Sequence, residues 1–309
     1  MTDVPTIPIG QTVDAGIQWL IDHAGGLFDA VSAALFFLVN LVYGVLAAPP
    51  SFVLIAILCV IAAWSTRNVG TTVSVALAFL LVDSMQLWHQ MLQTLSIVVL
   101  AASIAIAIGV PLGTLAAKSA KTSLVVRPVL DFMQTLPVFV YLVPAVFFFG
   151  IGVVPGIVST TVFAIPPAVR LTELGIRQVD GETVEAARAF GARPNQVLRE
   201  VELPLAVPSI MAGINQVIML ALSMVVVAGL VGAEGLGGVV VEGVTQLNIG
   251  TAFEGGLAVV ILAVYLDRIT SIAGRSRRKR RKDRLVPFRR FGTRRDLSPE
   301  PSEDLVATQ

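Results

Sequence analysis

Residues 185–204 read Glu-Ala-Ala-Arg-Ala-Phe-Gly-Ala-Arg-Pro-Asn-Gln-Val-Leu-Arg-Glu-Val-Glu-Leu-Pro, and this polar stretch lies between two long apolar regions of the chain. Charged and small residues alternate with helix formers around a central glycine, which predicts two short helices joined by a tight turn. The proline at position 204 predicts that the second helix ends or kinks there. A polar helix pair buries little of its own surface, so we expect it to fit against another protein.

The composition of the chain is that of a membrane protein. Of its 309 residues, 55% are hydrophobic and 14% are charged, with a mean hydropathy of +0.82, whereas an ordinary soluble domain is about 25% charged. The net charge of +1 combines a body of 10 basic and 16 acidic residues with a tail, 275–309, of 12 basic and 5 acidic residues. The sequence therefore excludes a soluble globular protein. No cleavable signal peptide is expected, because residues 1–26 lack a basic start and an unbroken apolar run.

Seven apolar stretches predict membrane spans, and the two shortest need flanking polar groups to reach the interfaces. They lie near residues 50–66, 69–84, 93–116, 135–151, 154–170, 208–231 and 251–270. An eighth stretch, 27–47, is joined to the first by only three residues and carries Asp29 and Asn40 on one face. We interpret it as an amphipathic helix at the outer interface, with an eighth span as the alternative.

Lys and Arg occur in alternate connections only. The connections 85–92, 152–153 and 232–250 contain neither residue type. Basic residues in short loops stay on the cytoplasmic side, so the pattern predicts a cytoplasmic loop at 171–205, a cytoplasmic C-terminus and an extracytoplasmic N-terminus. The basic tail is expected to be disordered and to anchor the topology at anionic lipid, in preference to binding nucleic acid.

The spacing within residues 185–204 resembles the EAA signature of binding-protein-dependent ABC transporter permeases. That signature is Glu-Ala-Ala, three residues, Gly, nine residues and Ile-x-Leu-Pro, and only Val201 departs from it, with its shape preserved. The segments 127–137, 163–170 and 208–226 look like the glycine betaine/proline subfamily. The resemblance covers about residues 15–275.

This resemblance implies an all-α fold of the type I ABC importer permease, with about seven transmembrane helices, in a bacterial inner membrane. Residues 1–48 would form the extracytoplasmic segment, 49–91 two accessory helices, 92–274 the permease core and 275–309 the tail. The loop would seat in a separate ATPase subunit, which binds ATP and Mg²⁺, so no cofactor is expected in this chain. The resemblance assigns coupling to Glu185, Ala186, Ala187, Gly191, Val201, Leu203 and Pro204.

It further implies an extracytoplasmic substrate-binding protein, a second permease copy, and a cargo of the glycine betaine or proline type, with choline, carnitine or an amino acid as alternatives. Asn215, Met219 and Ser223 recur every fourth residue and would either line a polar path or form interhelical hydrogen bonds. Asp131 is expected to face a cavity or to lie near Arg127.

Two further features have simpler interpretations. The aromatic run 147–149 is expected to pack or face lipid rather than to bind a quaternary ammonium ion. The glycine-rich stretch 232–238 lacks the context of a nucleotide-binding turn, and the resemblance makes it part of a flexible outer gate.

Catalytic and metal-binding residues are not expected. Cys59, His23 and His89 offer no metal cluster or disulfide, and Lys118 lacks the glycines of a Walker A loop. An ion-coupled secondary transporter would need inverted repeats or intramembrane ionisable pairs, and a structural scaffold would not need the signature. We therefore expect a transporter subunit that is not itself an enzyme.

Overall fold

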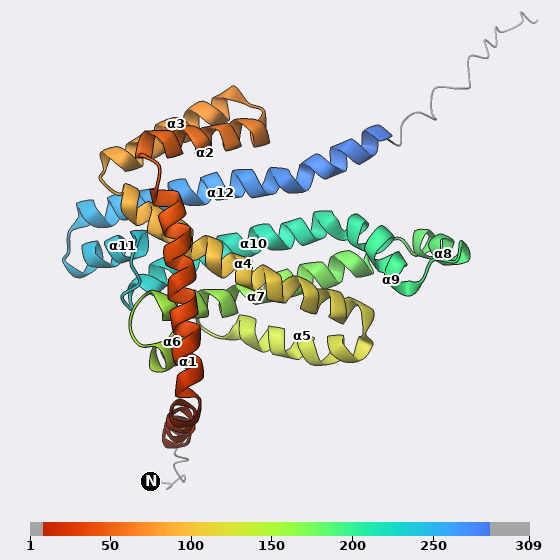
Figure 1. The fold of residues 1–309 in the computed structure, drawn as a ribbon, viewed down its shortest axis with the longest axis horizontal. Helices are drawn as coiled ribbons and strands as arrows, with labels where there is room; N and C mark the ends of the chain where they lie inside the picture. The colour runs from red at the N-terminus through yellow and green to blue at the C-terminus, as the bar shows by residue number, and fades with distance from the viewer. Residues whose placement is uncertain (1–8, 285–309) are drawn as a thin grey trace, which may run out of the picture.

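The computed structural model describes residues 9–284, which are helical almost throughout and contain no strand in that range. This confirms the predicted all-α class. Helices α4, α7, α10 and α12 run side by side along the long axis of the molecule (Figure 1). The helices are α1 (Ile9–Ala47), α2 (Ser51–Thr66), α3 (Val69–Ser84), α4 (Trp88–Lys118), α5 (Ala120–Thr135), α6 (Phe139–Phe149), α7 (Val153–Arg177), α8 (Gly181–Ala189), α9 (Pro194–Gln196), the π-helical turn η1 (Val197–Glu202), α10 (Leu203–Gly229), α11 (Leu236–Thr245) and α12 (Ile249–Arg284).

Five helices of the described chain are long and apolar enough to cross a membrane, and a sixth span results if the bent pair α5 and α6 counts as one. The five are α1, α4, α7, α10 with the turns before it, and α12. Helices α2 and α3 match the first two predicted spans, yet each has 16 residues. At 1.5 Å per residue they are about 24 Å long, which is shorter than a hydrocarbon core of about 30 Å.

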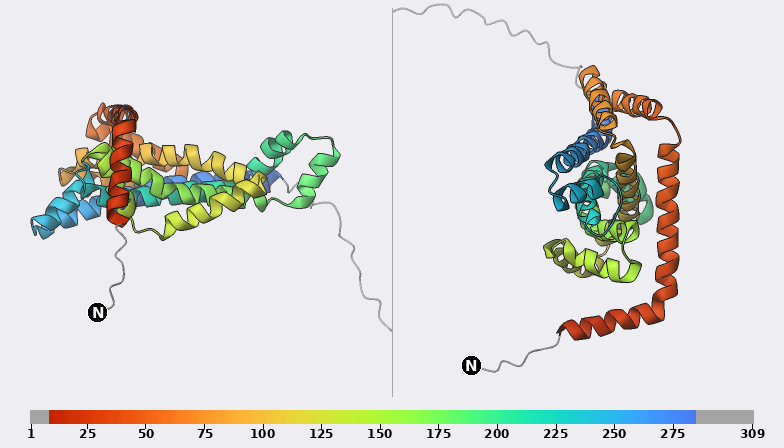
Figure 2. Two further views of the ribbon diagram at one scale, coloured as in Figure 1. Left: turned by 90° about the horizontal axis from the view of Figure 1, so that it is seen from below. Right: turned by 90° about the vertical axis from the view of Figure 1, so that its left-hand side faces the viewer.

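Helix α1 is long enough to span, but it runs across the bundle. Seen along the bundle axis, α4, α7 and α10 appear end-on, whereas α1 lies lengthwise around them and turns a corner in the same plane (Figure 2). Large apolar side chains on it are exposed, Trp19, Leu27 and Phe37 among them. On the inner side, Phe28 stacks on Phe148 of α6 with ring centroids 4.7 Å apart. This direction favours a helix that lies along a membrane surface.

The fourth predicted span, 135–151, is wrong as a single straight helix. Helix α5 ends at Thr135, and α6 leaves it at 95°. The break lies at Leu136, whose backbone is extended (φ −73°, ψ 135°), because the ring of Pro137 disfavours helical geometry in the residue before it. Helix α5 instead covers residues 120–135, which the sequence had assigned mainly to a loop.

Glycines bring α4, α7 and α10 into close contact. A Cβ on Gly113 of α4 would lie 2.5 Å from the carbonyl oxygen of Val169, and one on Gly175 of α7 would lie 2.6 Å from the Cβ of Ser209. Small residues at helix crossings allow this backbone approach, which drives association in membranes where the hydrophobic effect cannot. These three helices therefore form a tightly packed centre.

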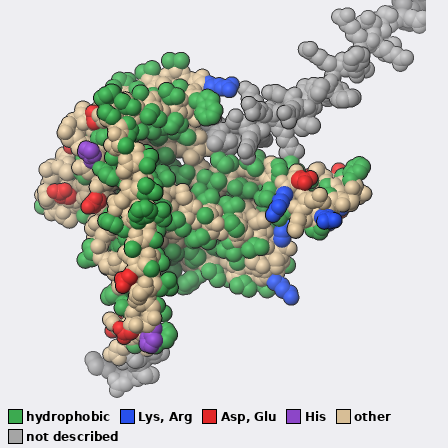
Figure 3. All heavy atoms as spheres, in the orientation of Figure 1, with side chains coloured by type: hydrophobic (Ala, Val, Ile, Leu, Met, Phe, Trp, Pro, Cys, Tyr) green, Lys and Arg blue, Asp and Glu red, His purple; other side chains and the backbone are tan. Residues whose placement is uncertain are grey.

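The two ends of the bundle differ in charge. Lys and Arg side chains gather at the end that carries α8 and α9, whereas the opposite end shows acidic side chains (Figure 3). The acidic end includes α11, which the sequence had left as a connection. There Gly237 packs so tightly that a Cβ would lie 2.1 Å from the carbonyl oxygen of Val225. Gly237 thus allows α11 to pack closely on α10, whereas the flexibility expected of the stretch 232–238 stays a prediction.

The C-terminal helix extends beyond its predicted end. Helix α12 continues to Arg284, so the first ten residues of the segment 275–309 are helical, in contrast to the expected disorder. The remainder of that predicted tail lies outside the described residues.

Candidate functional site

The signature residues form a helical loop that projects from the basic end of the bundle, beyond the ends of α7 and α10 (Figures 1 and 2). Its first helix, α8, contains no buried residue. Asp180 caps this helix: its carboxylate accepts hydrogen bonds from the backbone N–H of Glu182 (3.2 Å) and the hydroxyl of Thr183 (3.1 Å). An acceptor at this position satisfies backbone donors that have no partner inside the helix. The loop therefore begins in a defined conformation although nothing covers it.

Gly191 forms the turn between α8 and α9. Its φ is +83°, in the left-handed region that side chains with a Cβ rarely adopt. The N–H of Gly191 donates to the carbonyl of Arg188 (2.9 Å), and the N–H of Ala192 donates to that of Ala187 (3.1 Å). Beyond the turn, the N–H of Arg193 donates to the side chain of Gln196 (2.9 Å). The chain thus reverses within a few residues, as the sequence predicted.

The signature residues divide into exposed and partly covered positions. Glu185 and Ala186 of α8 and Pro204 are exposed, whereas Ala187, Val201 and Leu203 are half-buried. Next to the turn, Phe190 exposes 93% of its surface, and spacing alone did not single it out. An aromatic side chain of that size in water, on a loop with no other partner, is typical of an interface anchor.

Pro204 does not end the helix, which runs from the turn η1 directly into α10. The wide turn η1 precedes it, with the N–H of Leu203 donating to the carbonyl of Leu198, five residues back. Proline has no N–H and crowds the carbonyl four residues before it. A turn with i+5 bonding relieves that crowding, so the helix continues from the loop into α10.

Two ion-pair groups attach the loop and its neighbours to the bundle, and the sequence analysis identified neither. Lys118, the last residue of α4, pairs with Glu202 of η1. Deeper, the carboxylate of Glu173 on α7 is 4% exposed and accepts from the guanidinium groups of Arg127 and Arg177, each at 3.0 Å. The hydroxyl of Ser123 also donates to it, at 2.8 Å. A buried carboxylate is tolerated when it is paired and hydrogen-bonded in this way.

The ion-pair partner of Asp131 is a residue that the sequence analysis did not identify. Its carboxylate pairs with Arg170 of α7, whereas Arg127 pairs with Glu173. Both pairs cross from α5 to α7. They explain how α5 carries charged residues within the helical bundle.

The three residues of the polar row on α10 separate into two roles. The side-chain amide of Asn215 donates to Asp267 of α12 at 3.0 Å and accepts from the hydroxyl of Thr270. Met219 and Ser223 are exposed, and the Ser223 hydroxyl donates to the carbonyl of Met219 within the helix (3.0 Å). Asn215 thus joins two helices, whereas Met219 and Ser223 face outward.

Other features single out no reaction chemistry. Among the described residues no group of three or more His, Cys, Asp or Glu side chains could hold a metal ion. In the aromatic run, Phe148 and Phe149 pack against Phe28 of α1. These phenylalanines therefore pack against protein. The feature of the described chain that is built for contact is the projecting loop.

Comparison with known proteins places this geometry in context. Residues 109–279 match the family described as binding-protein-dependent transport system inner membrane component. The chain is 47% identical over 271 residues to the glycine betaine transport system permease protein OpuAB of Bacillus subtilis, covering 87% of this chain and 95% of that protein. It is 44% identical to the glycine betaine/proline betaine permease protein ProW of Escherichia coli, covering 89% of this chain and 77% of that protein. Among solved structures, an inward-facing form of the MetNI methionine ABC transporter aligns with a TM-score of 0.56 and 25% identity, over 60% of this chain and 92% of that one.

Proposed function

The chain belongs to the family of inner membrane components of binding-protein-dependent transport systems, and on that premise we propose that it imports glycine betaine or a closely similar solute. It is a multi-pass membrane subunit of an ABC importer, not an enzyme, and the family requires ATPase and substrate-binding partners. The observation that carries the proposed cargo is the identity of 44–47% to permeases named for glycine betaine, over almost the whole chain.

The projecting loop would be the surface that receives the ATPase. Its exposed helix α8, the reversal at Gly191 and the 93% exposed ring of Phe190 suit insertion into a groove of another protein. The small side chains of Ala186 and Ala187 allow close approach, and Glu185 can accept a charge-assisted hydrogen bond. Val201, Leu203 and Pro204 would form the base of this coupling surface.

Movement of the loop would reach the spans through two connections. The turn η1 continues into α10, and the pair between Lys118 and Glu202 ties the same turn to α4. ATP binding and hydrolysis in the partner would thereby shift α4 and α10 relative to each other, which exposes the transport path to one side of the membrane and then to the other.

The path itself would lie between two copies of the chain. Met219 and Ser223 lie exposed on α10, together with Gln216 one turn away. In a protomer that stands alone, polar side chains in mid-span would face lipid at a cost. A second copy placed against this row would convert it into the lining of a polar passage.

Transport in reconstituted liposomes tests the proposed function. The permease is combined with its ATPase and binding protein, and ATP is enclosed at the ATPase side. Uptake of labelled glycine betaine is measured with unlabelled glycine betaine, choline, carnitine or proline as competitors. We expect uptake that requires both ATP and the binding protein, with glycine betaine the strongest competitor. Uptake driven by a sodium or proton gradient without ATP would instead support a secondary transporter.

A further inference from the structure

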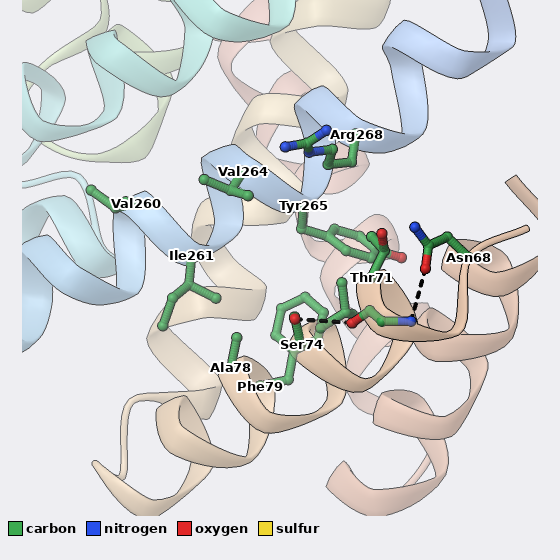
Figure 4. Close-up of a pocket in the computed structure, with 12 residues that line it drawn as sticks. Asn68, Thr71, Ser74, Ala78, Phe79, Val260, Ile261, Val264, Tyr265 and Arg268 are labelled. Carbon is green, nitrogen blue, oxygen red and sulfur yellow. Dashed lines mark hydrogen bonds between the residues drawn. The ribbon is translucent and has the colours of Figure 1, made fainter. Parts of the chain in front are cut away.

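A groove opens between α3 and α12, away from the proposed transport path. Its volume is about 510 Å³, within the range of about 300–1,000 Å³ that is usual for ligand sites. It exists because α3 packs mainly against α2 and touches α12 only lightly. The close-up shows side chains of both helices directed into this space (Figure 4).

The floor of the groove is firmly held. Phe79 of α3 and Tyr265 of α12 are both buried, and their rings meet edge to face with centroids 4.9 Å apart. The Tyr265 hydroxyl donates to the carbonyl of Leu58 in α2 at 3.3 Å. Three helices thus fix the two aromatic rings, so the groove is preformed.

The groove has an apolar length and one polar end. Val260 and Ile261 lie at one end, and Asn68 and Arg268 lie at the other (Figure 4). Arg268 makes no ion pair or side-chain hydrogen bond with any residue that the structure describes. The polar end lies at the α2–α3 turn, which contains Asn68 and points toward the end of the bundle that carries the loop (Figure 1).

We propose that this groove binds one phospholipid with an anionic head group, taken from the leaflet at the basic end of the bundle. An acyl chain would lie along Ala78 and Val264, and the head-group phosphate would contact Arg268 with Asn68 beside it. The groove opens beside apolar side chains of α3 that are exposed, such as Leu77, and hydrocarbon is what fills such a space in a bilayer. The guanidinium of Arg268, which has no ion-pair partner among the described residues, supplies the preference for negative charge.

Photochemical labelling of the full chain tests this site. The permease in phosphatidylcholine nanodiscs receives a trace of either phosphatidylglycerol or phosphatidylcholine carrying a photoreactive acyl chain, and labelled peptides are identified by mass spectrometry. We expect the phosphatidylglycerol probe to label α3 and α12 along the groove. Arg268→Gln should lower that labelling about fivefold, the value of one basic contact with an anionic lipid, and leave the phosphatidylcholine probe unchanged.

Two matched controls separate the groove from general effects. Ala78→Trp fills the groove and should reduce labelling by both probes, whereas Leu77→Trp on the outer face of α3 should not. Arg67→Gln removes a basic residue near the same end but outside the groove, and should leave labelling as it is. Equal labelling by the two probes, unchanged labelling in Arg268→Gln or Ala78→Trp, or an unlabelled groove covered by a second copy would each overturn the proposal.

Discussion

The backbone of Gly191 controls the shape of the projecting loop at the scale of a single residue. Its φ of +83° is accompanied by open space around the position of a missing Cβ, so conformation rather than crowding restricts the residue. A side chain other than glycine costs about 1–2 kcal/mol in left-handed geometry. Valine, which is β-branched, is among the least compatible residues there.

We expect Gly191→Val to reduce ATP hydrolysis stimulated by the binding protein, because the loop would no longer present Phe190 and α8 in the same orientation. The matched control is Gly181→Val, at a glycine that also has open space around it but has an ordinary backbone conformation. Stimulated hydrolysis is measured in liposomes for both variants, after their membrane insertion is verified. Equal stimulation in the two variants would contradict the assignment of the loop to coupling.

The carboxylate of Glu173 holds three donors from two helices, so we expect Glu173→Gln to destabilise the fold. The charged hydrogen bonds that are lost suggest a cost of about 2 kcal/mol. The cost is moderated because Arg127 and Arg177 are 58% and 40% exposed and can be solvated. The melting temperature of the detergent-solubilised protein measures the effect, with the exposed Glu254→Gln as control. An unchanged melting temperature would show that the cluster does not stabilise the packing of α5 on α7.

At the scale of a single helix, the placement of α1 along the outer membrane surface can be tested directly. If α1 lies on the outer surface, a cysteine placed at Gln18 in a Cys59→Ser background reacts with an impermeant thiol reagent added to intact cells. A cysteine at the exposed Ala189 of α8 should react only after lysis. Reaction of the Gln18 position only after lysis would place the N-terminus inside and make α1 an eighth span.

Several helices could be predicted from apolar length alone, and α2, α3, α4, α7, α10 and α12 all lie where the sequence indicated. Helix α5 could not be predicted in this way, because Lys121, Arg127 and Asp131 made it resemble a loop. Two of those charges are neutralised by α7, and such pairing is a property of the tertiary structure. Helix α11 could not be predicted from apolar length either, because it is too short for a span and rich in glycine. Length also cannot tell whether a helix runs along the bundle or across it, which is why α1 remained ambiguous.

The features of the candidate site also divide into those that local sequence predicts and those that depend on tertiary packing. Spacing located the loop and the turn at Gly191, because these depend on local backbone conformation. The exposure of Phe190, the pair between Lys118 and Glu202, and the separation of Asn215 from Met219 depend on which helices meet. The signal that could have found Asn215's role was the presence of Asp267 and Thr270, one turn apart, in the last predicted span.

At the scale of the whole molecule, the exposed row on α10 leads us to expect two permease copies in the active transporter. Native mass spectrometry of the purified complex should give two copies of this chain. In liposomes, Ser223→Trp should block uptake of the solute while the ATPase remains bound, because the indole would fill the passage. The control Leu77→Trp changes an exposed residue of α3, outside the row on α10, and this variant should transport normally. A single copy per complex, or normal uptake by Ser223→Trp, would refute this arrangement.

The wide turn before Pro204 also makes the azimuth of the loop about the axis of α10 tolerant of a change in chain length. A π-helical turn holds one residue more than the regular helix around it, and one residue of an α-helix corresponds to a rotation of about 100°. Removing a single residue between Val197 and Glu202 would therefore leave one ordinary helical turn and keep α8 pointing in nearly the same direction. A residue lost from the regular helix on either side would instead swing α8 by about 100°, so a partner would have to dock from another direction. The wide turn is thus the one place near the loop where the chain length can change by a residue without re-aiming the docking surface.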